Sequence, residues 1–384
     1  MERVVVTGIG VVSALGIGID EFQKNAAAGH DVITEVERFD ASHYRSRMGG
    51  EIKNFVPYLR RISPSAFGTA AIYGASAARM AYEDAGAEKT GDISQAGVFM
   101  GTNMGDCDEV KTDEGIMRFP AYNIITALCR EMGVCGETAM LPNACAAGNY
   151  GIISAYEKIR AGKIKYAFAG GAEALLETAY LGFSKLRALS PEKCRPFDKN
   201  RTGMAIGEGA AVLFMESLAG AKKRGARIYA EVSGWGASCD AFNMVVPKPD
   251  GSGIRRAMAD AVASAGLTAG DIDYICAHGT GSQANDAAEA AAINSLFGRS
   301  VAVSSLKSMI GHAMGAASAI EAAACCLAVH TGIIPPTINF ETPDPMCDID
   351  CVVNKARQMR VRAAANNASA FGGNNTCVIF REVS

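Results

Sequence analysis

The feature that most constrains the fold is a plan of structure that occurs twice in the chain. Residues 79–105 (RMAYEDAGAEKTGDISQAGVFMGTNMG) predict a helix that ends at Ala85-Gly86, a polar loop and a strand. Residues 256–281 (RAMADAVASAGLTAGDIDYICAHGTG) predict the same succession, with the helix ending at Ala265-Gly266. Such self-similarity indicates a duplicated unit and disfavours two unrelated domains.

A second pair of segments repeats a different plan. Residues 137–162 and residues 301–332 each predict a strand, a tight turn of small residues and a long helix. Strands that alternate with helices favour a layered α/β fold with parallel pairing. We place the divide near Arg227, which gives an N-terminal half of residues 1–226 and a C-terminal half of residues 227–384. No low-complexity linker separates the halves, so we expect them to share one core.

Composition excludes several classes of protein. The chain is 384 residues long, 49% hydrophobic and 20% charged, which is ample for a large core. A net charge of −3 gives no reason to expect nucleic acid or an anionic membrane as a partner. The start, MERVVVTGIG, is not typical of a signal peptide, and no run of eighteen uninterrupted apolar residues predicts a membrane span. We therefore expect a cytosolic protein.

Cysteine usage points the same way. Most of the twelve cysteines lie in apolar runs, and no Cys-x-x-Cys pair or Cys/His ladder predicts a structural zinc site. In a reducing compartment such cysteines act as small core residues.

Cys145 stands apart because of its surroundings in LPNACAAGNYGI. A short strand-like run precedes it, and GIISAYEKIR follows with apolar residues at helical spacing. Cys145 is therefore predicted in the turn before a helix N-terminus, where unpaired N–H groups favour an anion and lower a thiol pKa. This predicts an exposed, activated nucleophile, although a buried cysteine in an alanine-rich turn is equally compatible with this segment alone.

Two of the five histidines also follow predicted strands. His278 comes after DYICA and His312 comes after VAVSSL, each in a Gly-rich turn before an alanine-rich helix. Ligands of α/β sheets bind at that edge, so we expect both histidines at the site, in positions that correspond to that of Cys145. The other three, His30, His43 and His330, are predicted to be surface or packing residues.

Lys307 lies five residues before His312 and needs a carboxylate partner near a sheet edge. Glu321 or Glu289 could supply it, and such a pair would position the histidines. Near the C-terminus, Phe371 opens an FGG motif whose glycines can adopt positive φ and expose N–H groups. Such a turn can donate to an oxyanion, and a plain Gly-rich hairpin is the alternative.

The sequence resembles the elongating β-ketoacyl-ACP synthases, which are condensing enzymes of fatty-acid and polyketide synthesis. The resemblance implies the thiolase fold, with duplicated βαβαβ halves in α-β-α-β-α layers. It covers nearly the whole chain through motifs that occur in order: RVVVTGIGVVSALG, NACAAGN, AGGAEA, CRPFDKNRTGMAIGEGAAVL, AHGTGSQANDAAE, SSLKSMIGHAMGAASAIEA, IPPTIN and FGGNN.

Carried over to this chain, the resemblance implies a role for each candidate residue. Cys145 is the implied acyl-accepting nucleophile, His278 and His312 the catalytic histidines, and Lys307 the lysine of the site with Glu321 as its partner. The N–H groups of Cys145 and Phe371 form the implied oxyanion hole, with Phe371 also as the gatekeeper. Thr280 and Ser282 match positions that hydrogen-bond the pantetheine arm.

The implied reaction is a decarboxylative Claisen condensation. Cys145 takes an acyl group from a thioester, and a malonyl thioester on acyl carrier protein loses carbon dioxide and attacks it to give a 3-oxoacyl product. No metal or redox cofactor is implied, because the phosphopantetheine arrives on the carrier protein. The family also implies a dimer, either of identical chains or with a homologous subunit.

Two departures from the family pattern bear on specificity. Where these enzymes usually read NSFGFGG, this chain reads NASAFGG, with Ser369 for a phenylalanine and Ala370 for a glycine of the gate hinge. Alanine tolerates positive φ poorly, so gate motion is expected to differ. The region from Gly105 to Thr138, implied to help form the dimer interface and the acyl pocket, is shorter than usual. Both changes favour a specialised polyketide or polyene synthase.

Three other classes compete with a condensing enzyme. A non-catalytic partner of the chain-length-factor type lacks the cysteine, whereas Cys145 is present here. A thiolase-type acyl-CoA acyltransferase uses a second cysteine in its C-terminal Gly-rich motif, where this chain has Phe371. A cysteine hydrolase would give Lys307 and the duplicated halves no role.

Overall fold

The computed structural model describes residues 1–107, 109–112, 115–118 and 120–383. A 12-stranded sheet runs through both halves of the chain in the order β16-β14-β13-β18-β19-β12-β1-β11-β9-β5-β8, with β2 paired to β1. The strands β1 and β12 meet antiparallel at Val4–Val6, which joins the two halves into one sheet. The expectation of a shared core is confirmed for the central cluster, which contains residues of both halves, including Ile152 and Leu306.

The N-terminal half supplies five long or central strands and the helices between them. These are β1 (Val4–Ser13), α2 (Thr69–Asp84), β5 (Gly97–Gly101), α3 (Asn123–Met132), β8 (Thr138–Leu141), α4 (Ala147–Arg160), β9 (Tyr166–Glu173) and β11 (Gly209–Ser217). Peripheral elements are β2 (Gly16–Ile17), α1 (Ile19–Ala28), β3 (Thr34–Glu35), β4 (Met48–Gly50), β6 (Glu109–Thr112), β7 (Gly115–Arg118), α5 (Glu177–Lys185), β10 (Ile206–Gly207) and α6 (Leu218–Lys223).

The C-terminal half repeats this composition. Its main elements are β12 (Ala230–Cys239), α7 (Ser252–Ser264), β13 (Tyr274–Cys276), α8 (Gln283–Phe297), β14 (Ala302–Ser304), α10 (Met314–Thr331), β18 (Ala363–Ala370) and β19 (Asn374–Arg381). The short elements are α9 (Lys307–Ile310), β15 (Ile333–Ile334), β16 (Asp350–Cys351) and β17 (Arg357–Gln358).

Strand topology confirms the duplication. In each half the first strand (β1 or β12) pairs antiparallel with the fifth (β11 or β19), and the fifth pairs antiparallel with the fourth (β9 or β18). The fourth strand then pairs parallel with the second (β5 or β13), and the second pairs parallel with the third (β8 or β14). The predicted helix ends are also correct, because α2 and α7 stop just before Ala85 and Ala265 and are followed by Gly86 and Gly266 with positive φ.

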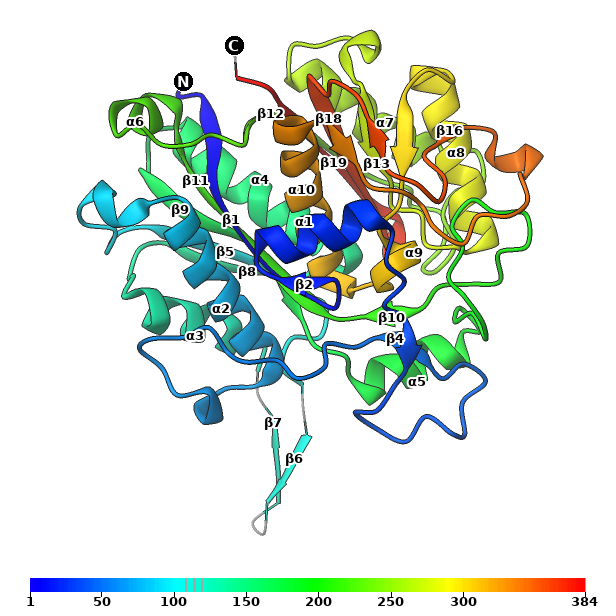
Figure 1. Cartoon of the computed structure of the whole chain (residues 1–384), viewed down its shortest axis with the longest axis horizontal. Helices are drawn as coiled ribbons and strands as arrows, with labels where there is room; N and C mark the ends of the chain where they lie inside the picture. The colour runs from blue at the N-terminus through cyan, green and yellow to red at the C-terminus, as the bar shows by residue number, and fades with distance from the viewer. Residues whose placement is uncertain (108, 113–114, 119, 384) are drawn as a thin grey trace.

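The helices form three layers around the two halves of the sheet. Helices α4 and α10 contact each other, and each contacts strands of both halves, so they form a central layer. Helices α2 and α3 cover the outer face of the N-terminal half, and α7 and α8 cover that of the C-terminal half. Figure 1 shows α10 in the middle, with α2 and α3 on one side and α7 and α8 on the other. The α-β-α-β-α layering of the thiolase fold is confirmed.

Most of helix α10 is apolar, and most of it is enclosed by the rest of the fold. Its sequence, MGAASAIEAAACCLAVHT, is long and apolar enough to cross a membrane by length and composition, but 83% of it is buried in the structure. Its alanine and glycine residues let it approach the strands of both halves and helix α4 closely. It is a core helix of the fold and not a membrane span.

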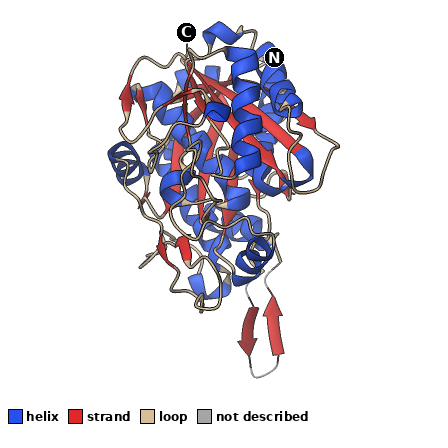
Figure 2. Ribbon diagram, turned by 90° about the vertical axis from the view of Figure 1, so that its right-hand side faces the viewer, coloured by secondary structure: helices blue, strands red, loops and turns tan. Residues whose placement is uncertain are grey.

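A hairpin formed by β6 and β7 extends away from the body of the molecule in both views (Figures 1 and 2). It belongs to the segment from Gly105 to Thr138, and residues 108, 113–114 and 119 of that segment lie outside the described residues. Its expected part in a dimer interface and an acyl pocket therefore stays a prediction.

Candidate active site

Three loops at the carboxyl ends of strands β8, β13 and β14 bring the candidate catalytic groups together. Cys145 lies in a single 3-10 turn, Ala144–Ala146, between β8 and α4. His278 follows β13, and His312 lies between α9 and α10. The Cys145 Sγ atom and a ring nitrogen of each histidine all lie within 4.8 Å of one another. His278 and His312, which follow Cys145 by 133 and 167 residues in the sequence, thus lie beside it in the structure.

Only one histidine occupies the position that corresponds to that of Cys145. Cys145 follows β8, the third strand of its half, and His312 follows β14, the third strand of the other half. His278 follows the second strand, β13, so the expectation that both histidines correspond to Cys145 is wrong for His278. The site is therefore formed by the segments that follow the second and third strands of the C-terminal half and the third strand of the N-terminal half.

These groups line a cavity of about 180 Å³. The lining is mainly apolar, and the implied pantetheine-binding and gate residues lie in it together with the three reacting groups. The lining residues are Cys145, Phe183, Leu186, Ala188, Met204, Asp240, Val245, Val246, Pro247, His278, Thr280, Ser282, Ala284, Asn285, His312, Ser369, Ala370, Phe371, Gly373 and Asn375.

The turn that holds Cys145 is strained and tightly packed. Ala144, the residue before the cysteine, has φ of 49°, a left-handed conformation that is unfavourable for alanine. On the first turn of α4, a Cβ atom at Gly148 would lie 2.6 Å from the backbone nitrogen of Ala319 on α10. The small residues around Cys145 therefore permit the close contact of α4 with α10.

The prediction of an exposed cysteine with a lowered pKa is wrong. Cys145 is 6% exposed, and burial raises the pKa of its thiol to about 12. The cation of Lys307 acts in the opposite direction and the carboxylate of Glu173 adds to the rise. Loss of hydration outweighs the helix terminus, since a thiolate in a mainly apolar cavity has little to replace water. Cys145 is a neutral thiol that faces the cavity.

Both histidine rings are neutral donors or acceptors near pH 7. Burial lowers the pKa of His278 and of His312 well below the usual value of 6.5, and the positive charge of Lys307 lowers each further. The rings meet edge to face with centroids 5.2 Å apart. The Nδ1 atom of each is buried without a hydrogen-bond partner, so neither ring is anchored through that atom. A neutral imidazole can offer one N–H to a substrate oxygen.

Lys307 forms its ion pair with Glu321, as predicted, behind the cavity wall. Lys307 and Glu321 are each 1% exposed, and the Lys307 Nζ donates to the Glu321 Oε1. Burial raises the pKa of Glu321 to about 7, against the opposing charge of Lys307. Glu289, the other candidate partner, instead accepts hydrogen bonds from the backbone N–H groups of His278 and Gly279 at 2.7 and 2.8 Å.

Thr280 and Ser282 both line the cavity beyond His278. The Thr280 hydroxyl donates to the Ser282 Oγ at 3.0 Å, and Ser282 also caps α8 by accepting from the Asn285 N–H at 3.4 Å. The carboxylate of Asp286 accepts from the N–H groups of Thr280 and Gly281 at 3.1 Å each. The hydroxyls that are candidates for the pantetheine arm are thus held by their own loop.

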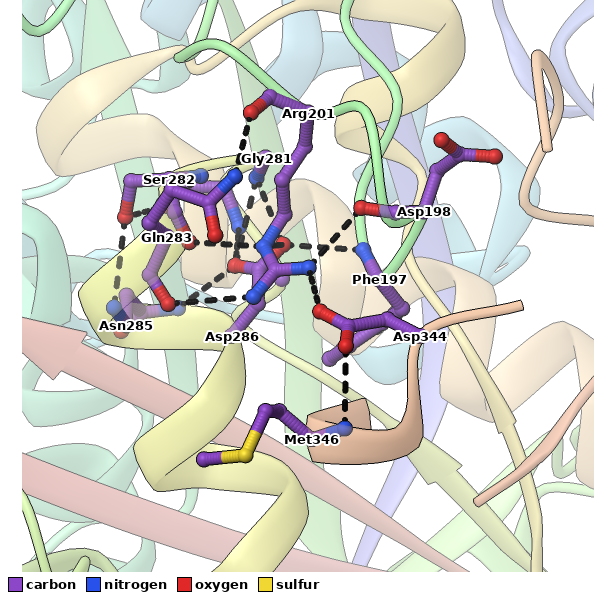
Figure 3. A network of polar contacts seen from close by, with 12 residues as sticks. Phe197, Asp198, Arg201, Gly281, Ser282, Gln283, Asn285, Asp286, Asp344 and Met346 are labelled. Atoms are coloured by element: carbon purple, nitrogen blue, oxygen red, sulfur yellow. Dashed lines mark hydrogen bonds and ion pairs between the residues drawn. The ribbon is translucent and has the colours of Figure 1, made fainter. Parts of the chain in front are cut away.

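A buried arginine ties that loop to two other segments, a role that the sequence analysis missed. Figure 3 shows Arg201 between Asp286 and Asp344. Its guanidinium donates to Asp344 at 2.5 Å and to the carbonyls of Asp198 and Gln283 at 2.8 and 3.2 Å. The CRPFDKNRTG motif contains this arginine, so the motif was the available signal. The network positions the segment that carries His278.

A second missed residue is Glu173, from the AGGAEA motif. Its buried carboxylate accepts from the N–H groups of Asn103, Met104 and Gly315 at 2.6, 2.9 and 2.9 Å. It therefore fastens the loop after β5 to the first turn of α10. Burial raises the pKa of Glu173 to about 7, which these hydrogen bonds oppose.

The loop that follows β18 covers one side of the cavity. Phe371 is 37% exposed and its ring packs on Phe183 with centroids 5.5 Å apart. Gly372 and Gly373 have positive φ, whereas Ala370 has φ of −135°, which any residue can adopt. Ala370 is therefore unstrained in this conformation, since the left-handed residues of the loop are both glycines, and the expected difference in gate motion stays a prediction.

The remaining three histidines are surface residues, as predicted. His30, His43 and His330 are all exposed. They lie in the segment after α1, in the loop before β4 and near the end of α10. None of them lines the cavity that contains Cys145.

Comparisons with known proteins agree with this arrangement. The family model described as the N-terminal domain of β-ketoacyl synthase matches residues 1–221, and that of the C-terminal domain matches residues 229–341. The chain is 36% identical to a 3-oxoacyl-[acyl-carrier-protein] synthase 2 of Synechocystis, over 99% of this chain and 98% of the relative. It is 37% identical to the tetracenomycin polyketide synthase ketoacyl synthase alpha subunit of Streptomyces glaucescens, over 97% of this chain and 95% of the relative.

Among solved structures, the ishigamide ketosynthase/chain length factor superposes with a TM-score of 0.94 at 38% sequence identity, and each chain is covered completely. The similarity thus spans both halves, and the cavity lies between loops of both. The chain therefore belongs to the β-ketoacyl synthase family, acyltransferases that carry out the β-ketoacyl-ACP synthase condensation in fatty-acid or type II polyketide synthesis.

Proposed function

We propose that Cys145 is the acyl-accepting nucleophile of this condensation and that His278 and His312 activate the malonyl unit. The observation that carries the proposal is the convergence of the three groups, within 4.8 Å of one another, at a mainly apolar cavity. Their protonation states also support it. A neutral thiol beside two neutral imidazoles can react without first separating charge in a cavity that would penalise ions.

In the first half-reaction the Cys145 Sγ attacks the carbonyl carbon of an acyl thioester. The new C–S bond forms first and gives a tetrahedral oxyanion, which collapses as the bond to the donor sulfur breaks, and the thiol proton passes through a neighbouring imidazole to the departing thiolate. The tetrahedral oxyanion accepts hydrogen bonds from the N–H groups of Cys145 and Phe371. Protons and charge are balanced in this half-reaction, because one thiol is consumed at Cys145 and one thiol is released on the donor.

In the second half-reaction a malonyl thioester enters. Its C–C bond to the carboxylate breaks, carbon dioxide leaves, and the electron pair forms an enolate that accepts N–H donors from His278 and His312. The carbanion attacks the acyl carbon, and the bond to Cys145 breaks to release a 3-oxoacyl thioester. The thiolate then takes one proton from the solvent, which restores the neutral thiol, so the condensation consumes one proton for each carbon dioxide that leaves. Lys307 and Glu321 act behind the histidines as positioning residues.

The proposed partner is an acyl carrier protein that presents its thioester along Thr280 and Ser282. Both residues line the cavity, which opens beside exposed Phe371. The name of the Synechocystis relative includes such a carrier. We further propose a cytosolic location, since core cysteines such as Cys276, Cys325 and Cys326 are buried thiols, as expected in a reducing compartment.

The proposal is tested by Cys145→Ala with Cys135→Ala as the matched control, because Cys135 is exposed and does not line the cavity. Intact mass spectrometry after incubation with an acyl carrier thioester should show one acyl adduct on the wild-type chain and on Cys135→Ala. Cys145→Ala should fold, form no adduct and give no condensation product. An adduct on the Cys145→Ala chain would show that the nucleophile is another residue.

A further inference from the structure

Ser369 lines the reaction cavity, and its buried hydroxyl has no hydrogen-bond partner in the structure. It is the second-last residue of β18, it is 5% exposed, and it lines the cavity together with Cys145 and both histidines. Its Oγ atom is buried and has no hydrogen-bond partner. Burying a hydroxyl without a partner costs free energy, so we expect a bound substrate to supply that partner.

The other hydroxyl and amide side chains that line the described cavity each take part in at least one hydrogen bond. Thr280, Ser282 and Asn285 belong to the network around Asp286. The Asn375 amide donates to Asp240 at 2.8 Å. Ser369 alone among them makes no bond, and it stands where the resembled family usually has a phenylalanine. The chain therefore has a hydroxyl without a partner in the lining of the cavity that contains its reacting groups.

We propose that Ser369 binds the carboxylate of the malonyl thioester before decarboxylation. The inference rests on the proposed function, in which backbone N–H groups face the acyl oxygen and the two histidines face the malonyl thioester oxygen. The carboxylate is then the remaining charged group on the reacting carbon. The charged side chain that lines the described part of the cavity is Asp240, which is an anion and repels a carboxylate. A hydroxyl donor is the group that can receive it.

The chemistry of the step predicts how this contact acts on the kinetics. The Ser369 hydroxyl donates a hydrogen bond to the carboxylate, and no proton is transferred. When the C–C bond breaks, the negative charge leaves the carboxylate for the enolate, and neutral carbon dioxide is a poor acceptor. The contact is therefore strongest in the ground state and weakens in the transition state. Such an interaction lowers KM for the malonyl thioester without raising kcat.

The test compares Ser369→Ala with Ser369→Thr, which keeps the hydroxyl, and with Ser264→Ala at the exposed end of α7 as the matched control. Removing an unpartnered buried hydroxyl should leave the thermal midpoint unchanged or raised, so loss of folding is not expected. We expect Ser369→Ala to raise KM for malonyl thioester about tenfold with kcat unchanged or higher, the Thr variant to stay within about threefold of wild type, and the control to match wild type.

Formation of the acyl-enzyme from a saturated acyl thioester should be equal in all four proteins. A KM for malonyl thioester that does not change in Ser369→Ala would overturn the inference. So would slower acyl-enzyme formation, or an effect seen only with acyl donors that carry an extra oxygen, since each would place the hydroxyl on the acyl group. A wild-type chain that forms no acyl-enzyme would instead refute the proposed function and is read from the same experiment.

Discussion

At the scale of single residues, one environment sets the protonation of three groups. Burial raises the pKa of the Cys145 thiol to about 12 and lowers the pKa of His278 and His312 well below 6.5. All three are neutral over the physiological range for the same reason, because each charged form would lose its hydration. Burial thus favours the neutral form of each of the three groups.

The charge on Lys307 is predicted to shift the acid limit of activity. Burial is the larger cause of the low pKa of both histidines, and the charge of Lys307 lowers that pKa further, so it helps to keep the rings neutral as the pH falls. Replacing the buried pair together, by Lys307→Met with Glu321→Gln, removes that field without leaving an unpaired ion. The histidine pKa values should then rise, and the acid limb of kcat/KM for malonyl decarboxylation should move to higher pH. The pH–rate profile measures this shift directly.

Glu321→Gln alone is the matched control, since it keeps the cation and removes its counter-ion. Its acid limb should stay in place or move to lower pH. If the double variant and the single variant shift in the same direction by the same amount, Lys307 does not act on the histidines through its charge.

At the scale of elements, the site depends on how closely α4 and α10 approach. Asn149 of α4 donates its backbone N–H to the Ser318 Oγ of α10 at 3.0 Å. The Asn366 amide of β18 donates to the Asn149 Oδ1 at 2.8 Å and to the Ser318 carbonyl at 2.7 Å. This contact places the first turn of α4, and with it Cys145, against the helix that follows His312. The distance between nucleophile and histidine is therefore a consequence of helix packing.

Gly148→Ala is predicted to disturb that packing. The added Cβ would lie 2.6 Å from the Ala319 nitrogen and 2.9 Å from the Ala319 Cβ, and the backbone of α10 cannot move aside cheaply. We expect a loss of about 1–3 kcal/mol in the free energy of unfolding and a fall in acyl-enzyme formation. Urea unfolding and intact mass spectrometry provide the two readouts.

Gly182→Ala serves as the comparison within the same fold. Gly182 lies inside α5, and a Cβ there would have no heavy atom within 4 Å. Alanine should stabilise that helix by up to about 1 kcal/mol. Equal stability of the two variants would mean that the close contact at Gly148 has no energetic importance.

At the scale of the whole molecule, the active site is a joint property of both halves. The nucleophile comes from the N-terminal half, and both histidines, the lysine and the loop that follows β18 come from the C-terminal half. A single sheet continues across β1 and β12, so neither half closes its core alone. The boundary at residues 226 and 227 stays a prediction, and it lies in the connection between α6 and β12.

The functional unit is predicted to be a dimer formed at the free edge of the N-terminal half. Strand β8 ends the sheet, and its residues are partly exposed, which leaves backbone groups available to a second chain. Multi-angle light scattering at micromolar concentration should give twice the mass of the 40.0 kDa chain. A monomer that dimerises only when a homologous subunit is added would indicate a heterodimer. A monomer under both conditions would contradict the prediction.

Sequence patterns predicted which residues form the site better than they predicted the contacts and protonation states of those residues. The identities of Cys145, His278, His312 and Lys307 came from strand ends and motifs, because such positions meet at one sheet edge in any duplicated α/β fold. Glu321 and Glu289 could not be told apart from spacing, since both lie on helices at similar separations from the lysine. Arg201 and Glu173 were within quoted motifs, but their partners are up to 143 residues away, and local patterns do not report such contacts.

The sequence by itself determined that the chain is a duplicated α/β protein with a cysteine and a histidine at equivalent strand ends, because alternation of strands and helices is a local property of the chain. The tertiary structure alone decided that Cys145 is a protonated thiol, that Ala370 is unstrained and that Ser369 has a free hydroxyl. Protonation, strain and hydrogen bonding depend on which distant groups exclude water from a residue. Those groups come from strands and helices that are brought together only when both halves pack around α4 and α10.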